Sequence, residues 1–278
     1  MKVSVLGCGT MGKGIAQVFA TYGNSVVAYD SLSKALEKAP SDIGASLDRL
    51  AKKDPEKFDK QQILPRITFT GNLEEIRGSD LVIEAVFERV EEKTALLRKV
   101  SDIIDDRCML ATNTSSISIN KLASAVRNPG RFLGMHFFNP VPVMKLVELV
   151  KGEHTDEAIL KKAYSISESI EKSPVISKDF PGFISNRILM PLIREAIAVY
   201  EEGIATPQDI DKTLRLGMNH PMGPLELADF VGLDVVYDVL KVLYDEYGEP
   251  RFKPPITLRN MVNSGKLGRK SGEGFYKY

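Results

Sequence analysis

The sequence contains few of the residues on which several protein classes depend. Of its 278 residues none is tryptophan, only two are cysteine and three are histidine. Cys8 and Cys108 lie far apart, in a predicted turn and a predicted strand, which excludes a fold built on disulfides. The histidines have no partner four residues away and no nearby cysteine, so the spacing predicts no metal site.

Long apolar runs and an excess of charge of either sign are also missing. No stretch reaches the ~18 consecutive apolar residues that a membrane span requires. The 37 basic residues balance the 37 acidic ones. We therefore expect no membrane segment and no general attraction to nucleic acid. Because the chain opens directly on an apolar run and uses cysteine sparingly, we expect a cytoplasmic protein.

A glycine-rich turn follows the first predicted strand, residues 2–6. The segment Gly7-Cys8-Gly9-Thr10-Met11-Gly12 precedes a helical pattern. In such a turn the first glycine permits the bend, the second lets the backbone approach a pyrophosphate, and the third lets the helix pack against the strand. The candidate dinucleotide contacts are Gly7, Gly9, Thr10, Met11 and Gly12. A purely structural turn remains the alternative.

Asp30 ends the second predicted strand, residues 26–29. A carboxylate at this place accepts hydrogen bonds from the adenosine ribose and repels a 2′-phosphate. Residues 31–33 supply no arginine for such a phosphate, so the sequence favours NAD over NADP. The alternative is that Asp30 only caps the next helix.

Further apolar runs at 81–87, 108–111 and 132–138 continue the pattern, with a helical stretch at 90–104. This alternation predicts an α/β fold with a doubly wound, Rossmann-type parallel sheet, whose ligands bind at the carboxyl ends of the strands. The polar candidates at those ends are Glu88, Lys93, Asn113, Thr114, Ser115, Ser116 and His136. For residues 113–116 the alternative is a cap, with Ser116 starting a helix over 117–125.

The alternation stops near residues 177–182, and helical patterns follow. We expect an NAD-binding domain over 1–180 and a smaller all-α domain over 181–278 for substrate binding and dimerisation. Residues 206–209 predict a helix start, and residues 220–224 predict a turn before a helix over 225–246. The apolar surface of so many short helices predicts that part of it is buried against another subunit.

Short motifs are distributed over nearly the whole chain. The most specific are His-Phe-Phe-Asn-Pro at 136–140 and Pro-Gly-Phe-Ile-Ser-Asn-Arg at 181–187. The others are the glycine turn and residues 79–85, 113–116, 220–224 and 268–276. Together they resemble the short-chain L-3-hydroxyacyl-CoA dehydrogenases, including the 3-hydroxybutyryl-CoA dehydrogenases. The glycine turn alone would not distinguish this family.

The resemblance implies a catalytic pair in the middle of the chain. His136 matches the family's general acid/base, and Glu148 matches the carboxylate that orients this imidazole. The roles suit the residues, because histidine changes protonation near neutral pH and a neighbouring carboxylate fixes its tautomer. The alternative is a structural core histidine, with Glu148 on an exposed strand face.

The resemblance also implies contacts to substrate and cofactor. Ser115 and Asn186 match polar contacts near the reacting atoms, with Ser115 serving both ligands. The positions expected near the cofactor are Glu88, Lys93, Asn139 and Lys270. Ser46 and Lys53 match contacts to coenzyme A, for which the alternative is a solvated helix face within residues 34–60.

The implied reaction is the NAD-dependent interconversion of (S)-3-hydroxyacyl-CoA and 3-oxoacyl-CoA. The expected pair is 3-hydroxybutyryl-CoA and acetoacetyl-CoA, in fatty acid or butanoate metabolism. One alternative is a β-hydroxy-acid dehydrogenase of free acids, which typically uses a lysine instead of a histidine–glutamate pair. Another is a non-catalytic NAD-binding protein. Acyl chain length and physiological direction remain open.

Overall fold

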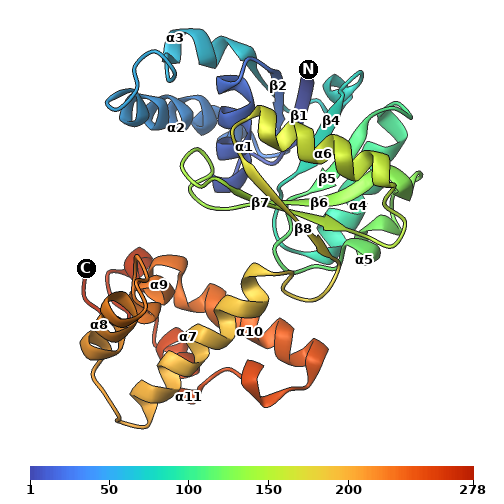
Figure 1. The fold of residues 1–278 in the computed structure, drawn as a ribbon. Helices are drawn as coiled ribbons and strands as arrows, with labels where there is room; N and C mark the ends of the chain where they lie inside the picture. The colour runs from blue at the N-terminus through green and yellow to red at the C-terminus, as the bar shows by residue number, and fades with distance from the viewer. The chain divides into compact units, whose positions relative to one another are not determined.

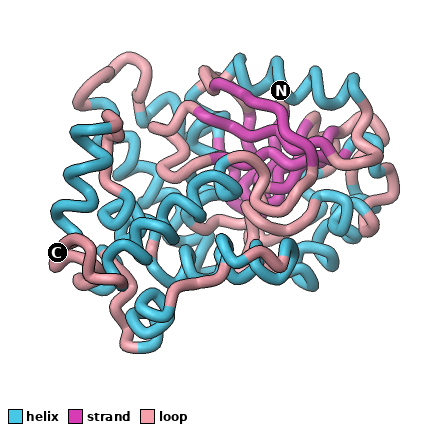
Figure 2. Tube along the Cα trace, turned by 60° about the horizontal axis from the view of Figure 1, so that its bottom comes forward, coloured by secondary structure: helices cyan, strands magenta, loops and turns pink.

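The computed structural model describes residues 1–278, which form two compact units, Met1–Phe180 and Pro181–Tyr278. All strands of the sheet belong to the first unit, and the second is made of helices and loops (Figures 1 and 2). The strands are β1 (Lys2–Leu6), β2 (Ser25–Tyr29), β3 (Ile67–Thr70), β4 (Leu81–Glu84), β5 (Met109–Thr112), β6 (Phe132–Phe137), β7 (Leu146–Lys151) and β8 (Ser173–Lys178). The helices of the first unit are α1 (Thr10–Thr21), α2 (Ser33–Ala51), α3 (Lys60–Ile63), α4 (Val90–Ile103), α5 (Ile119–Ala123) and α6 (Glu157–Ser169).

The eight strands form one sheet in the order β3-β2-β1-β4-β5-β6-β7-β8. Strands β1 to β6 are parallel, β7 runs antiparallel to β6, and β8 runs parallel to β7. The chain moves outward from β1 in both directions, so right-handed connections place α1 on one face and α4 on the other. The predicted Rossmann-type fold is confirmed. Its switch point lies between β1 and β4, where such sheets bind ligands.

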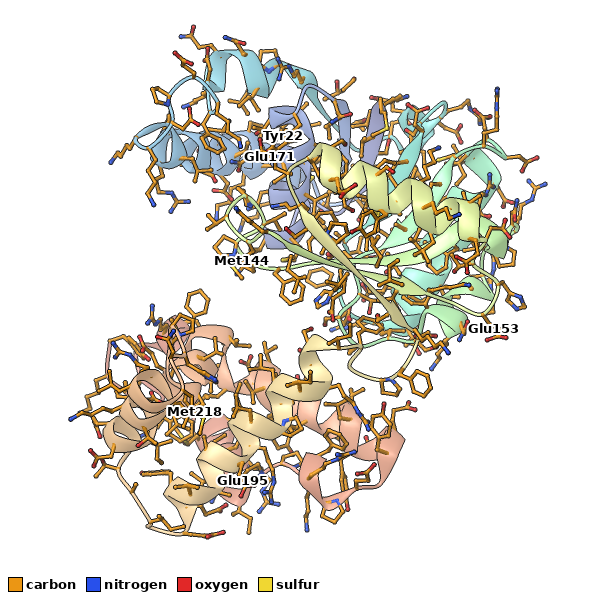
Figure 3. All side chains as sticks on the ribbon, in the orientation of Figure 1. Tyr22, Met144, Glu153, Glu171, Glu195 and Met218 are labelled. Atoms are coloured by element: carbon orange, nitrogen blue, oxygen red, sulfur yellow. The ribbon has the colours of Figure 1, made fainter.

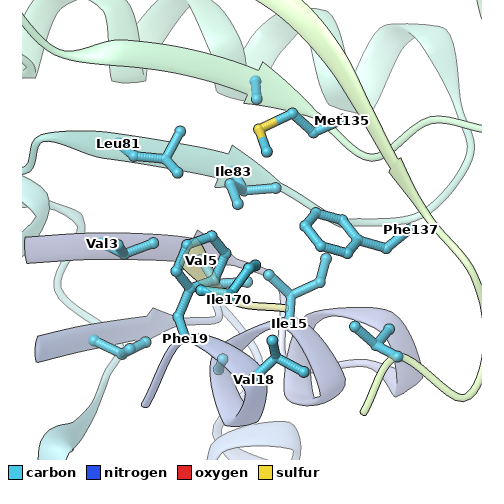
Figure 4. Packing of buried hydrophobic residues seen from close by; sticks show 14 of the residues in the cluster. Val3, Val5, Ile15, Val18, Phe19, Leu81, Ile83, Met135, Phe137 and Ile170 are labelled. Carbon is cyan, nitrogen blue, oxygen red and sulfur yellow. The ribbon is translucent and has the colours of Figure 1, made fainter. Parts of the chain in front are cut away.

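The core lies between the sheet and helix α1 (Figure 4). Val3 and Val5 on β1 pack with Ile15 and Phe19 on α1, and all four are fully buried. Burying a side chain of this size stabilises the fold by about 1.5–3 kcal/mol. Because helices cover both faces, the central strands are apolar almost throughout. A polar side chain in such a strand therefore requires a specific partner.

Two strands, β3 and β8, have no counterpart among the predicted elements, and β7 has one only in the alternative that placed Glu148 on an exposed strand face. β3 is short and alternates in burial, β7 carries an acid within its apolar run, and β8 is largely exposed. The predicted strand 81–87 is shorter in the structure, where β4 ends at Glu84. Each departure occurs where local charge or brevity weakens the apolar pattern that marks a buried strand.

The helical excursion between β2 and β3 is tied to the sheet by Lys57. Its ammonium pairs with Glu171 Oε2 at 2.5 Å and lies 5.0 Å from the centre of the Tyr22 ring. Tyr22 and Glu171 lie close together in Figure 3. Because Tyr22 follows α1 and Glu171 precedes β8, this contact joins three segments distant in sequence.

The second unit contains α7 (Ser185–Glu201), α8 (Pro207–Gly217), α9 (Pro224–Val231), α10 (Leu233–Tyr247) and α11 (Ile256–Asn263). Thr206 caps α8 as predicted, since its side chain accepts from Asp209 N. The predicted single helix over 225–246 is wrong, because Gly232 separates α9 from α10 with φ of 105°. That backbone conformation is rare for residues with a side chain and interrupts a helix.

Candidate active site

In the glycine turn between β1 and α1, Gly7 and Gly12 are tightly packed, whereas Gly9 has open space beside its Cα. A Cβ on Gly7 would lie 2.7 Å from Ala85 O, and one on Gly12 would lie 1.8 Å from Gly7 O. A Cβ on Gly9 would meet no atom within 4 Å. Gly7 and Gly12 are therefore required by the fold itself. The open side of Gly9, at the start of α1, fits the approach of a pyrophosphate to helix N–H groups.

Asp30 holds the glycine turn from the end of β2. Its Oδ2 accepts from Cys8 N at 2.7 Å, and its Oδ1 accepts from Leu32 N at 2.9 Å. Helix α2 has Leu32 as its N-cap and no side-chain cap hydrogen bond. The alternative in which Asp30 only caps that helix is therefore wrong. The carboxylate sits beside the turn, where a ribose hydroxyl can add a further hydrogen bond.

Both cysteines of the chain are buried and free. Burial raises the pKa of the Cys8 thiol to about 12, and the neighbouring Asp30 carboxylate adds to this shift. Burial likewise raises the pKa of Cys108 to about 12. Because the thiolate is the reactive form, Cys8 contributes bulk to the turn rather than a nucleophile.

Strand alternation gathers four polar side chains on one face of the sheet. Leu81, Ile83, Met109, Ala111, Met135, Phe137, Val147 and Leu149 belong to the core on the α1 face. Successive strand residues point to opposite faces, so Glu84, Thr112, His136 and Glu148 face the other side. All four are buried. They come from β4, β5, β6 and β7, which are neighbours in the sheet.

His136 and Glu148 are direct partners in the antiparallel pair β6–β7. His136 Nδ1 lies 2.8 Å from Glu148 Oε2, and the two residues are only 8% and 1% exposed. The burial of Glu148 contradicts the alternative that placed it on an exposed strand face. A carboxylate on Nδ1 fixes the ring orientation and assigns proton exchange with a substrate to Nε2. The pair has the geometry of a general base and its orienting acid.

The loop after β5 is held by a single carboxylate oxygen, Oε1 of Glu88. It accepts from Thr114 Oγ1 at 2.6 Å, Ser115 N at 2.8 Å and Ser116 N at 3.2 Å. The alternative of a helix cap at Ser116 is wrong, because α5 starts at Ile119 with Ser118 as its cap. Residues 114–116 thus form a structured loop whose conformation depends on Glu88.

The same loop is joined to the strand that carries His136. Asn113 Oδ1 accepts from Phe137 N at 2.9 Å, one residue beyond His136. Asn139 follows in an exposed position and precedes a cis bond to Pro140. The candidate residues Ser115, His136 and Asn139 therefore belong to one connected group of loops at the carboxyl ends of β5 and β6.

Beneath this loop lies a buried ion pair. Lys93 Nζ lies 2.7 Å from Glu84 Oε1 and 3.2 Å from Glu88 Oε2, and the side chains of Lys93 and Glu84 are 1% and 0% exposed. Burial pushes the pKa of Glu88 up, but the Lys93 ammonium and hydrogen bonds from residues 114 and 115 outweigh it. They hold this pKa below its usual range. Lys93 therefore keeps Glu88 ionised at the edge of the site.

Glu84 and Thr112 are the polar residues of this face that the sequence does not identify as site residues. Glu84 lies within residues 79–85, one of the motifs of the family resemblance, and within an apolar run. The signal was present, since a charged residue is almost never fully buried without a partner. The partner, Lys93, lies on the first turn of the next helix.

The positions expected to contact coenzyme A lie on the excursion after β2. Ser46 is half-buried within α2, and Lys53 is exposed just beyond its end. In the second unit Asn186 is half-buried in the first turn of α7. Lys270 lies in a 3₁₀ turn, Arg269–Ser271, with its ammonium 2.5 Å from Asp234 Oδ2.

No group of three or more histidine, cysteine, aspartate or glutamate side chains is placed to hold a metal ion. No helix has the length and apolar character needed to cross a membrane.

Comparison with known proteins assigns both units to one family. Residues 2–180 match the 3-hydroxyacyl-CoA dehydrogenase NAD binding domain, and residues 182–278 match the C-terminal domain of the same family. The cofactor is accordingly NAD. A probable 3-hydroxybutyryl-CoA dehydrogenase of Deinococcus radiodurans is 46% identical over 278 residues, covering 100% of both chains.

Solved structures give the same result. FadB2 of M. tuberculosis superimposes with a TM-score of 0.96 at 41% identity, covering 99% of this chain and 98% of that one. The (S)-3-hydroxybutyryl-CoA dehydrogenase PaaH1 of Ralstonia eutropha gives a TM-score of 0.95 at 44% identity, covering 100% and 98%. The chain belongs to the 3-hydroxyacyl-CoA dehydrogenase family.

Proposed function

We propose that this chain catalyses the NAD-dependent interconversion of (S)-3-hydroxyacyl-CoA and 3-oxoacyl-CoA, with 3-hydroxybutyryl-CoA and acetoacetyl-CoA as its substrate pair. The observation that carries the proposal is the buried contact between His136 Nδ1 and Glu148 Oε2, at 2.8 Å. This histidine can accept a proton from a substrate hydroxyl group. It lies in the same sheet whose strands bind a dinucleotide at their carboxyl ends.

Different residues carry out proton transfer, orientation of the base and hydrogen bonding to the substrate in the proposed reaction. Bound NAD supplies the hydride acceptor, or in its reduced form the donor. His136 Nε2 takes the proton of the 3-hydroxyl during oxidation and returns it during reduction. Glu148 keeps the imidazole oriented. Ser115 and Asn186 donate hydrogen bonds to substrate oxygens on which charge develops.

The cofactor and coenzyme A are assigned to separate sets of residues. The turn from Gly7 to Gly12 takes the pyrophosphate, Asp30 takes the adenosine ribose, and Glu88, Lys93, Asn139 and Lys270 complete the cofactor site. Ser46 and Lys53 take coenzyme A, whose phosphates require local basic residues because the chain has no net charge.

The second unit supplies the surface for a homodimer in this proposal. Several of its large apolar side chains are exposed, among them Ile188, Ile204, Leu216, Met218 and Ile256. Several exposed apolar side chains of this size on one domain favour burial against a second copy. We place the reaction in the cytoplasm, where NADH and CoA thioesters are available together. Light scattering of the purified chain measures the dimer, and a monomer at micromolar concentration would contradict it.

A spectrophotometric assay tests the reaction. We expect purified protein to oxidise NADH in the presence of acetoacetyl-CoA, much more slowly with NADPH, and not with free acetoacetate. Activity with free acetoacetate alone would instead favour a dehydrogenase of free acids. Binding of NADH without turnover on acetoacetyl-CoA or longer 3-oxoacyl-CoA esters would favour a non-catalytic protein.

A further inference from the structure

Glu84 is a buried carboxylate that accepts hydrogen bonds from three residues. Its Oε1 accepts from Lys93 Nζ and Val86 N, each at 2.7 Å, and its Oε2 accepts from Thr112 Oγ1 at 2.7 Å. One side chain therefore joins the end of β4, the first turn of α4 and the end of β5. It is fully buried and lies on the same face of the sheet as His136.

Two routes lead from Glu84 to Ser115. Along the first, Lys93 Nζ also contacts Glu88, whose Oε1 accepts from Ser115 N at 2.8 Å. Along the second, Thr112 Oγ1 accepts from Thr114 N at 3.2 Å, one residue before Ser115. Both routes end in the same three-residue stretch. A shift of Glu84 would thus move the loop from two sides.

The buried ion pair between Glu84 and Lys93 contributes more to fixing the positions of its neighbours than to the stability of the fold. A buried ion pair loses the hydration of both charges, and replacing it by packed apolar residues is often neutral or stabilising. All three donors of Lys93 are used, by Glu84 Oε1, Glu88 Oε2 and Val86 O. Such a fully satisfied network holds its members in one arrangement.

We propose that Glu84 is a positioning residue for the dehydrogenase reaction, which acts through Lys93 and Thr112 to fix Glu88 and Ser115 against the reacting atoms. This role rests on the proposed function of Ser115. Glu84 itself contacts neither substrate nor cofactor in this proposal. Its removal would leave the acid–base pair in place and misalign the loop beside it.

The test uses matched variants of Thr112, a residue outside the proposed contacts. Thr112→Val keeps the shape and removes the hydroxyl, whereas Thr112→Ser keeps the hydroxyl and removes a methyl group. Glu84→Gln keeps the shape and removes the charge. Misplacement by about 1 Å costs about a hundredfold in rate, so we expect kcat to fall about ten- to hundredfold in Thr112→Val and Glu84→Gln. Thr112→Ser should stay within about threefold of the wild type.

Two controls separate positioning from a general loss of structure. The dissociation constant of NADH should rise by a smaller factor than kcat falls in each variant, because only Glu88 and Lys93 of the cofactor site are affected and the contacts of the glycine turn and Asp30 remain. Ser4→Ala removes the buried hydrogen bond between Ser4 Oγ and Ser79 Oγ, which are 2.7 Å apart. Both residues are far in sequence from the loop at residues 114–116. This variant should lower the melting temperature without changing kcat per folded molecule.

The outcomes are distinguishable. If the wild type does not reduce any 3-oxoacyl-CoA ester, the proposed function fails and the role of Glu84 fails with it. If the wild type is active and Thr112→Val and Glu84→Gln retain kcat, only the positioning role is overturned. Equal losses in Thr112→Val and Thr112→Ser would also overturn it, by showing an effect of packing alone. Should Glu84→Gln not fold, the Thr112 pair still decides.

Discussion

His136 and Glu148 face each other across β6 and β7, with Nδ1 2.8 Å from Oε2. His136→Ala should lower kcat for acetoacetyl-CoA by about 10²–10⁴-fold, because it removes proton transfer. The dissociation constant of NADH should stay nearly unchanged. His136→Asn is the matched control, since its amide can still donate to Glu148. It should recover stability lost in His136→Ala but not turnover, and recovered turnover would contradict the catalytic role.

Gly9 and Gly12 should respond in opposite ways to the same substitution. Gly12→Ala would place a Cβ 1.8 Å from Gly7 O, so we expect a marked loss of melting temperature. Gly9→Ala meets no atom within 4 Å, and the fold should remain intact. Its added methyl group would enter the space expected for the pyrophosphate, so NADH binding should weaken at least tenfold. Tight NADH binding by a folded Gly9→Ala variant would place the pyrophosphate elsewhere.

Asp30→Ala should weaken NADH binding and narrow the preference for NADH over NADPH. The substitution removes the expected ribose acceptor and the charge that repels a 2′-phosphate. It also removes the 2.7 Å hydrogen bond from Cys8 N, so part of the loss will come from the turn itself. Asp30→Asn retains an acceptor for that N–H and separates the two effects. Unchanged selectivity in both variants would limit Asp30 to a structural role.

Lys172 should give stability a specific dependence on pH. Its ammonium donates to Val141 O and Met144 O, and burial lowers its pKa to about 8, with Lys57 adding to the shift. Between pH 8 and the ordinary value of 10.5 the unfolded chain binds more protons at this residue than the folded one. Its contribution to the free energy of unfolding should therefore rise with pH across that window and stay constant below pH 8.

Urea unfolding of Lys172→Met at pH 7 to 10 measures this contribution. Relative to the variant, the wild type should gain stability as pH rises above 8. Lys145→Met removes the same charge from an exposed position of the adjoining loop. A difference of the same size in that control would assign the effect to net charge instead of to the buried amine.

The two cysteines should resist alkylation in the folded protein. With the pKa of each thiol raised to about 12, the thiolate fraction at pH 7.5 is negligible, and both side chains are buried. Iodoacetamide should modify neither residue until denaturant is added, when both should react. Mass spectrometry of the treated protein gives the result. Rapid modification of Cys8 alone would mean that the glycine turn opens readily.

Much of the fold could be predicted from the sequence because its signals are local. The apolar strand before the glycine turn and the cap at Thr206 each depend on a few neighbouring residues. Strand β7 was harder, because Glu148 interrupts its apolar run and its partner strand lies elsewhere. The break at Gly232 was missed because the apolar pattern continues through it, while the backbone does not.

Part of the site could be predicted from the sequence through the family resemblance. That resemblance implies both His136 and Glu148 and their pairing, whereas periodicity alone does not give the strand register that aligns them. The roles of Glu84 and Thr112 depend on hydrogen bonds between three strands and a helix. No spacing along the chain encodes those contacts. They appear only when the ends of β4 and β5 are placed side by side.

The antiparallel pairing of β6 and β7 makes the alignment of His136 with Glu148 depend on strand register. Direct partners in such a pair point to the same face, so the backbone register aligns His136 with Glu148. A slip of one residue would turn one of the two side chains into the α1 core. An insertion in the connecting segment, residues 138–145, that shifted this register would therefore separate the pair while leaving both of its residues unchanged.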